Sequence, residues 1–243
     1  MPTVLLLGAT SDIGYAIAKK FAEHNYSLQL AGRSLERLKP LQTDIQIRYG
    51  VECSIHVFDA VDFDSHPSFY QNLPVKPDIT ICSVGYMNEN EKVIASPEET
   101  FLTIRTNYTG PVSILNIVAA DYASRGQGAI AGISSVAGLR GRQSNYIYGS
   151  SKAGFITYLS GLRNRLYPHN VHVLTILPGF VYTKMTDFRE FPKMLVAKPE
   201  DVANSVYNAL LKKKNVVYIR WFWRWIMLVI RNIPEFKFKK LKL

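Results

Sequence analysis

The chain has 243 residues, of which 47% are hydrophobic and 20% are charged. This size and composition predict one folded domain with a sizeable core and exclude an intrinsically disordered protein. The two cysteines, Cys53 and Cys82, lack metal-ligand or redox spacing, so we predict a reducing, cytoplasmic setting, no disulfide framework and no metal site. The first apolar run, Val4–Leu7, is too short and uncharged for a signal peptide.

The formal charge of +10 could indicate a nucleic-acid-binding protein, but it is unevenly distributed. Residues 212–243 hold ten lysines and arginines against one acid, a net +9, which leaves +1 for residues 1–211. The basicity therefore belongs to the C-terminal segment, and we predict no nucleic-acid partner.

Short apolar runs alternate with longer helical patterns up to residue 219. We predict strands at Thr3–Leu7, Ser27–Ala31, Ser54–Phe58, Ile79–Cys82, Ala129–Ile133, Val171–Leu177 and Val216–Ile219. We predict helices at Ile13–His24, Leu35–Tyr49, Glu98–Thr106, Val112–Arg125, Tyr148–Tyr167 and Glu200–Leu211. Such alternation predicts an α/β, Rossmann-type fold: a single doubly wound parallel sheet of about seven strands with helices on both faces. We assign residues 1–219 to this domain and residues 220–243 to a basic, Trp-rich tail.

The first strand leads through Gly8-Ala9-Thr10-Ser11-Asp12-Ile13-Gly14 directly into a helix. Glycine at the strand end lets the backbone approach a phosphate without a Cβ in the way. The helix N-terminus presents unpaired N–H groups and a positive dipole end to a pyrophosphate. Thr10 and Ser11 add hydroxyl donors, and Gly14 permits close packing of helix on strand. The position of this turn favours dinucleotide binding.

The second strand ends at Arg33 and Ser34, where an enzyme that prefers NAD would carry an acid. A guanidinium suits a 2′-phosphate, with the Ser34 hydroxyl as a second donor, so we predict NADP(H) in preference to NAD(H). An exposed arginine that caps a strand is the alternative. Asp59, followed by Ala60 at the end of the third strand, could accept from an adenine amino group or could cap a turn.

The fifth strand leads into Ser134-Ser135-Val136-Ala137-Gly138, and Tyr148 and Lys152 follow on a predicted helix. Residues four apart share a helix face, so the Lys152 ammonium lies beside the Tyr148 phenol, favours the phenolate and lowers the phenol pKa. Tyr148 then becomes a usable acid and base near neutral pH, and the Ser135 hydroxyl can hold a carbonyl oxygen against it. Tyr146 lacks a lysine four residues on, so we prefer Tyr148.

Together these motifs resemble the short-chain dehydrogenase/reductase family over residues 3 to 219. Gly8 and Gly14 match the Gly-rich turn of that family. The resemblance implies that Ser135, Tyr148 and Lys152 are its catalytic serine, tyrosine and lysine, and that the chain reduces a carbonyl with a nicotinamide cofactor.

The resemblance extends to two further segments. Asn107 matches the asparagine that anchors a water-linked proton relay to the catalytic lysine, which makes it the fourth catalytic candidate. In Pro178-Gly179-Phe180-Val181-Tyr182-Thr183, Val181 and Thr183 are implied to contact the nicotinamide carboxamide. The residues that we expect to bind the cofactor are Gly8, Thr10, Ser11, Asp12, Ile13, Gly14, Arg33, Ser34, Asp59, Ala60, Ser83, Gly85, Asn107, Tyr148, Lys152, Pro178, Gly179, Val181 and Thr183.

The chain departs from the family pattern at two places. Asp12 stands where the middle glycine of the turn is usual, and we expect it to remodel the turn slightly and to suit a helix N-cap. Ser83-Val84-Gly85 replaces the usual Asn-Ala-Gly, and backbone contacts to the cofactor ribose should survive this change.

Two segments bear on the substrate. We expect the insert Lys184–Met194 to cover the active site, and its Met, Phe and basic residues suit a substrate with apolar and anionic parts. In the tail, Arg220, Arg224 and Arg231 share one side of a helical wheel whose remaining surface is apolar and Trp-rich. Its longest apolar run, Trp225–Ile230, is too short to span a bilayer.

These features predict an amphipathic helix in the interface of the membrane, at the inner face of the cytoplasmic membrane, with the terminal lysines attracted to anionic lipid. The alternative is a helix packed on its own domain or on a partner subunit. The run Arg224–Pro234 and the run Phe180–Thr186 are similar to a subgroup of the family, the decaprenylphosphoryl 2-keto-pentose reductases. This likeness implies an NADPH-dependent ketoreductase that acts on a lipid-linked sugar in polysaccharide or cell-wall biosynthesis, as a homo-dimer or tetramer.

Two other functions stay open. One is a reductase of a free lipid ketone, such as a 3-oxoacyl chain or a keto-sphingoid base. The other is a non-catalytic NADP-binding regulatory protein that keeps the fold without the activity.

Overall fold

The computed structural model describes residues 1–184 and 193–241, and its main feature is a parallel sheet of seven strands in the order β3-β2-β1-β4-β5-β6-β9. These strands are β1 (Thr3–Leu7), β2 (Ser27–Gly32), β3 (Cys53–Val57), β4 (Ile79–Cys82), β5 (Gly128–Ile133), β6 (Val171–Pro178) and β9 (Val216–Ile219). The short strands β7 (Phe180–Val181) and β8 (Val196–Ala197) pair with each other beside it. Because the strand order reverses between β1 and β4, ligands of such a sheet bind at the carboxyl ends near this point.

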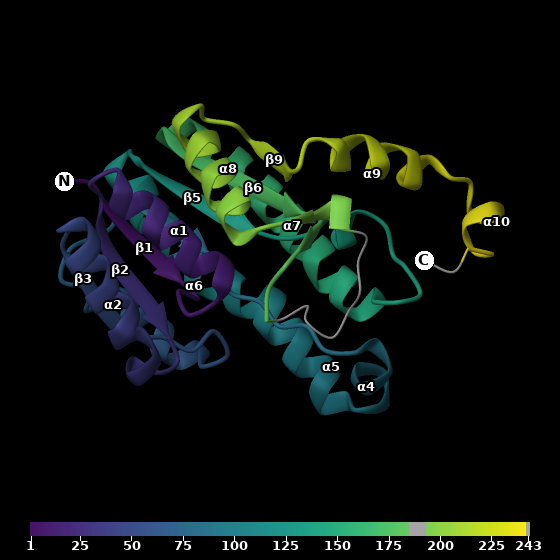
Figure 1. The fold of residues 1–243 in the computed structure, drawn as a ribbon, viewed down its shortest axis with the longest axis horizontal. Coiled ribbons are helices and arrows are strands. Elements are labelled where there is room, and N and C mark those ends of the chain that lie inside the picture. Colours follow the sequence, from purple (N-terminus) through teal and green to yellow (C-terminus); the bar gives the residue numbers. More distant parts are fainter. Residues whose placement is uncertain (185–192, 242–243) are drawn as a thin grey trace.

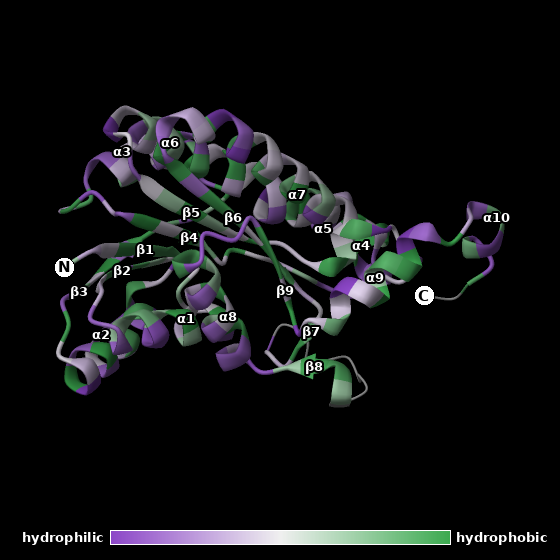
Figure 2. Cartoon of the chain, turned by 90° about the horizontal axis from the view of Figure 1, so that it is seen from above, coloured by the Kyte–Doolittle hydropathy of each residue, from purple (hydrophilic) through white to green (hydrophobic). Residues whose placement is uncertain are grey.

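Helices cover both faces of the sheet, as Figures 1 and 2 show. One face carries α1 (Asp12–Glu23), α2 (Leu35–Tyr49) and α8 (Pro199–Leu211). The opposite face carries α3 (His66–Gln71), α6 (Gly110–Arg125) and α7 (Tyr146–Leu166), with α4 (Asn90–Ala95) and α5 (Pro97–Ile104) beyond its end. The predicted single α/β domain with helices on both faces is therefore confirmed.

Strand β1 shows why this sheet reads as continuous apolar runs. All five of its residues are buried. Val4 and Leu6 pack into the core beneath α1 and α8, whereas Leu5 and Leu7 pack into the core beneath α6 and α7. A parallel strand covered on both faces needs apolar side chains at every position, so its sequence does not alternate.

The predicted strands and helices are all present, with ends that agree within two residues. The helices α3 and α4 were not predicted, because six residues are too few for a helical period to stand out. The predicted break between Thr106 and Val112 is a π-helical turn, Arg105–Thr109, that joins α5 to α6.

The tail differs in part from the prediction. Its helices are α9 (Phe222–Asn232) and α10 (Glu235–Phe238), so Arg220 lies before the helix, with φ +63°, and bonds to Asp201 at 3.3 Å. The prediction that Arg220 belongs to the basic stripe is therefore wrong, because a residue in the left-handed region cannot belong to the helix, whereas Arg224 and Arg231 both lie on α9.

Helix α9 packs on its own domain through one face. Trp223 and Met227 are buried in a small third core with Val136 and Leu177. Across the part of the chain that the structure describes, no helix is long and apolar enough to span a membrane.

Candidate active site

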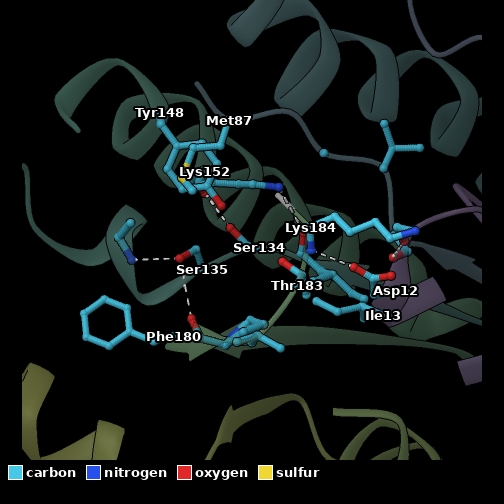
Figure 3. A pocket seen from close by; sticks show the side chains of 18 of the residues that line it. Asp12, Ile13, Met87, Ser134, Ser135, Tyr148, Lys152, Phe180, Thr183 and Lys184 are labelled. Atoms are coloured by element: carbon cyan, nitrogen blue, oxygen red, sulfur yellow. Dashed lines mark hydrogen bonds between the residues drawn. The ribbon is translucent and has the colours of Figure 1, made fainter. Parts of the chain in front are cut away.

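A cavity of about 330 Å³ lies at the carboxyl ends of β1, β2, β4, β5 and β6 (Figure 3). Of the predicted site residues, those that line it are Thr10, Ser11, Asp12, Ile13, Arg33, Ser83, Gly85, Ser135, Tyr148, Lys152, Pro178, Gly179, Val181 and Thr183. Gly8, Gly14, Ser34, Asp59, Ala60 and Asn107 lie outside its lining. The lining residues that sequence reasoning missed include Arg37, Met87, Arg142, Asn145 and Phe180.

The turn after β1 requires glycine and a hydroxyl. Gly8 has φ +84°, and a Cβ on it would lie 3.0 Å from the backbone of Ser83. The Ser11 hydroxyl caps α1 by accepting from the Gly14 amide at 3.0 Å and donates to the Gly8 carbonyl at 2.9 Å. The same hydroxyl lies 3.1 Å from the Ser83 hydroxyl. The unusual serine after β4 thus joins the two strand ends at the switch point.

Asp12 does not cap helix α1, contrary to the expectation from sequence. The cap is Ser11, so Asp12 already stands in the first turn, where its negative charge suits the helix dipole. Its carboxylate accepts instead from the Lys184 amide at 2.8 Å, as Figure 3 shows. Asp12 therefore joins the turn after β1 to the start of the predicted insert, of which residues 185–192 lie outside the described residues.

Two guanidinium groups lie at the end of β2. Arg33 and Arg37 both line the cavity and both are exposed. The Ser34 hydroxyl caps α2 by accepting from the Arg37 amide at 3.3 Å. Arg37 was not predicted, although its place in the first turn after Arg33 could have indicated it.

Asp59 and Ala60 shape the loop after β3. The Asp59 carboxylate accepts from the Val61 amide at 3.1 Å, which is the turn-capping arrangement that the sequence left open. A Cβ on Gly110 would lie 2.1 Å from the Ala60 carbonyl oxygen, so this loop packs directly on the start of α6.

Ser135, Tyr148 and Lys152 meet at the cavity between β5 and α7 (Figure 3). The Ser135 hydroxyl accepts from the Ala137 amide at 3.1 Å and donates to the Pro178 carbonyl at 3.5 Å. The Lys152 ammonium lies 5.8 Å from the centre of the Tyr148 ring.

Lys152 is buried, and its ammonium donates to the Ile133 carbonyl at 3.3 Å. Burial lowers the pKa of this lysine to about 8, because removal from water disfavours the charged form. The ammonium is therefore still charged at neutral pH, in a place where it can act on a neighbouring phenol.

Asn107 lies fully buried in the π-helical turn. Its side-chain oxygen accepts from the Tyr86 amide at 2.9 Å, while its nitrogen donates to the Tyr86 carbonyl at 2.7 Å and to the Thr103 carbonyl at 2.9 Å. The side chain thus fixes the loop after β4 against the helix that precedes α6. π-helical turns often mark functional sites.

Helix α9 supports the segment after β6. A Cβ on Gly179 would lie 2.1 Å from the Trp223 indole, so the ring rests directly on this glycine. The Phe180 ring meets the same indole edge-on, with 5.1 Å between centroids. The tail therefore packs against the segment that was predicted to contact nicotinamide. No local sequence signal indicates this packing.

The residues fit a nicotinamide dinucleotide. The N-terminus of α1 and the close backbone approach at Gly8 suit a pyrophosphate, and the arginines after β2 suit an anion at the ribose end. The side chains of Ser135, Tyr148 and Lys152 line the same cavity.

Comparisons with known proteins agree with this geometry. The family model for short chain dehydrogenase matches residues 2–192. An uncharacterized oxidoreductase of Mycobacterium tuberculosis is 30% identical over 241 residues, which covers 98% of this chain and 96% of the relative. A 3-oxoacyl-[acyl-carrier-protein] reductase of Chlamydia muridarum is 28% identical and covers 82% of this chain and 86% of its own.

A solved short-chain dehydrogenase from Sphingobium yanoikuyae, described as a complex with NADPH, has the same fold with a TM-score of 0.83. It is 24% identical to this chain and covers 97% of each chain. The chain therefore belongs to the short-chain dehydrogenase family and is an NAD(P)-dependent oxidoreductase.

Proposed function

We propose that this protein is a ketoreductase that uses Tyr148 as its general acid. The observation that carries the proposal is that Ser135, Tyr148 and Lys152 line one cavity, with the Lys152 ammonium 5.8 Å from the centre of the Tyr148 ring. Bound NADPH would supply the hydride that adds to the carbonyl carbon. The Ser135 hydroxyl donates a hydrogen bond to the carbonyl oxygen, and the Tyr148 hydroxyl gives its proton to the developing alkoxide.

Lys152 and Asn107 support this proton transfer. Lys152, whose pKa of about 8 leaves it charged at neutral pH, favours the phenolate that remains on Tyr148 and holds the nicotinamide ribose. Asn107 fixes the helix turn from which protons are resupplied to Lys152 through water.

The test is Tyr148→Phe, with Tyr146→Phe as the matched control because Tyr146 is exposed and lies on the same helix. A general acid accelerates a reaction by about 10²- to 10⁴-fold. The kcat of the Tyr148 variant should therefore fall by at least about 10²-fold, while its affinity for NADPH stays unchanged. Residual turnover within tenfold of the parent would refute the assignment.

We propose NADPH as the preferred cofactor, held at its 2′-phosphate by Arg33 and Arg37. Both guanidinium groups line the cavity end nearest β2. Arg33→Ala should raise KM for NADPH by tenfold or more and leave KM for NADH unchanged, because only the former carries the extra phosphate. Equal effects on both cofactors would contradict this preference.

We propose that the substrate is the keto group of a polyprenyl-phosphate sugar. The likeness of the tail to lipid-linked sugar reductases supports this class, whereas the similar 3-oxoacyl reductase favours the alternative of a free lipid ketone. NADPH oxidation by the detergent-solubilised protein with both substrate classes separates the two. Turnover of neither class would favour the non-catalytic alternative.

We propose that the tail associates with the inner face of the cytoplasmic membrane. One face of α9 is buried through Trp223 and Met227, while Trp225, Leu228 and Val229 on the other side are more than half exposed. Exposed apolar side chains flanked by basic ones suit an anionic lipid surface. The flanking basic residues are Arg224, Arg231, Lys237, Lys239 and Lys240.

The test is flotation of the protein with vesicles that contain anionic phospholipid. Replacing Trp225, Leu228 and Val229 by serine should abolish flotation without unfolding the protein, since these side chains are exposed. Ile47→Ser on α2, at 81% exposure, is the matched control. Flotation of the triple variant at the parental level would refute the membrane association.

We also propose a homo-dimer or tetramer, which light scattering of the purified protein tests.

A further inference from the structure

Asn145 occupies the N-cap position of α7 without capping that helix. Asparagine is a preferred N-cap because its side chain bonds to the first free amides. Here the side chain makes no such bond, and it is the backbone carbonyl of Asn145 that accepts from the Gly149 amide at 2.7 Å. The carboxamide is thus left for another purpose, three residues before Tyr148.

The side-chain oxygen of Asn145 is enclosed and unsatisfied. The residue is 7% exposed, and its Oδ1 atom is buried with no hydrogen-bond partner among residues 1–184 and 193–241. Buried polar atoms without a partner are rare in folded proteins and call for an explanation. Because Asn145 also lines the cavity, a bound ligand can supply the missing hydrogen-bond donor.

The same turn brings a cation to the cavity. The Asn145 amide donates to the Arg142 carbonyl at 3.2 Å, and both side chains line the cavity. The same cavity is also lined by the apolar side chains of Met87, Val136 and Phe180. A guanidinium is a planar fork of donors that matches phosphate oxygens.

We propose that Arg142 and Asn145 form a substrate subsite that selects a hydroxylated, phosphorylated ketone. Asn145 bonds to the hydroxyl on the carbon beside the reacting carbonyl, and Arg142 binds the phosphate of the same substrate. This inference rests on the proposed ketoreductase function and names the substrate class. A plain lipid ketone leaves the Asn145 carboxamide without a partner, and a site built around a substrate hydroxyl strongly rejects analogues that lack it.

The first experiment compares kcat/KM for 1-hydroxy-2-decanone and 2-decanone with NADPH. The parent should prefer the hydroxyketone by about 10²-fold or more, since a missing hydroxyl at a polar site costs at least this much. Asn145→Leu and Asn145→Ala should both reduce the preference to within about threefold, mainly by losing activity on the hydroxyketone. Gln143→Leu, at a neighbouring exposed position, should keep the parental preference.

The second experiment compares dihydroxyacetone phosphate with dihydroxyacetone. The parent should prefer the phosphate ester by about tenfold or more, and Arg142→Gln should remove that preference while Gln143→Leu keeps it. NADPH affinity, measured by fluorescence titration, should stay at the parental value in every variant that is folded.

The outcomes separate the two proposals. A parent that reduces ketones through Tyr148 but treats 1-hydroxy-2-decanone and 2-decanone alike refutes the subsite and leaves the ketoreductase intact. If both Asn145 variants keep the parental preference for 1-hydroxy-2-decanone, the subsite is likewise refuted and the ketoreductase is left intact. A parent that turns over no ketone overturns the ketoreductase and the subsite with it.

Discussion

Replacing Lys152 by methionine should make the protein more stable while it abolishes reduction. Burial lowers the pKa of Lys152 from 10.5 to about 8. Each pH unit between these values corresponds to about 1.4 kcal/mol, so the charged ammonium costs the cofactor-free folded state on the order of 3 kcal/mol. Methionine has a similar length, carries no charge and loses the bond to the Ile133 carbonyl, worth about 1 kcal/mol.

The net gain is about 2 kcal/mol, which for a chain of this length raises Tm by about 4–8 °C. The gain depends on pH. Below pH 8 the lysine is protonated in both the folded and the unfolded state, so the full cost is present. Between pH 8 and 10.5 only the unfolded state keeps the proton, so the parent gains stability as pH rises. The gap between the variant and the parent should therefore narrow over this range.

Urea unfolding of the cofactor-free parent and Lys152→Met at pH 7 and pH 9.5 measures both effects. Lys39→Met, at an exposed position of α2, is the control and should change the free energy of unfolding by less than about 0.5 kcal/mol. A variant that is less stable than the parent at pH 7 would refute the reasoning. So would a stability gap that is the same at both pH values.

Other substitutions test the contacts around the site. Gly179→Ala forces a methyl group into the Trp223 indole and should destabilise the fold by about 1–3 kcal/mol and weaken NADPH binding, as melting and cofactor titration will show. Asn107→Leu leaves the Tyr86 amide and carbonyl without their hydrogen-bond partners, and it should lower the free energy of unfolding, measured by urea titration, by about 2–5 kcal/mol. Arg140→Ala should speed proteolysis within α10 with little change in Tm, because its ion pair with α10 is at the surface.

The sequence predicted what local chemistry decides. The segment from Gly8 to Gly14 and the pair Tyr148 and Lys152 each span only a few residues, so their spacing already carries the geometry. Ser135 could be added because a parallel sheet brings all its strand ends to one edge. Residues 10–13 of the first segment line a common cavity with Ser135, Tyr148 and Lys152, whereas Gly8 and Gly14 lie outside its lining.

Contacts between distant segments could not be predicted in this way. The packing of Trp223 on Gly179 joins residues 44 positions apart, and neither residue type indicates the other. Asn145 reads as an ordinary helix cap, and only its unused carboxamide distinguishes it. The prediction that Asp12 caps α1 failed for a related reason. Ser11 beside it is an equally good cap and takes the N-cap position.

The tail shows where the helical wheel itself reaches its limit. A wheel separates apolar from charged positions, but it cannot divide the apolar positions between two different partners. In α9 the domain takes Trp223 and Met227, and Trp225, Leu228 and Val229 are left exposed. Since the Trp223 indole rests on Gly179, the helix cannot roll about its axis without moving the segment predicted to contact nicotinamide. If the exposed face of α9 binds a bilayer, the buried face of the same helix still supports the segment predicted to contact nicotinamide. Substitutions in α9 should therefore change lipid binding and cofactor affinity together.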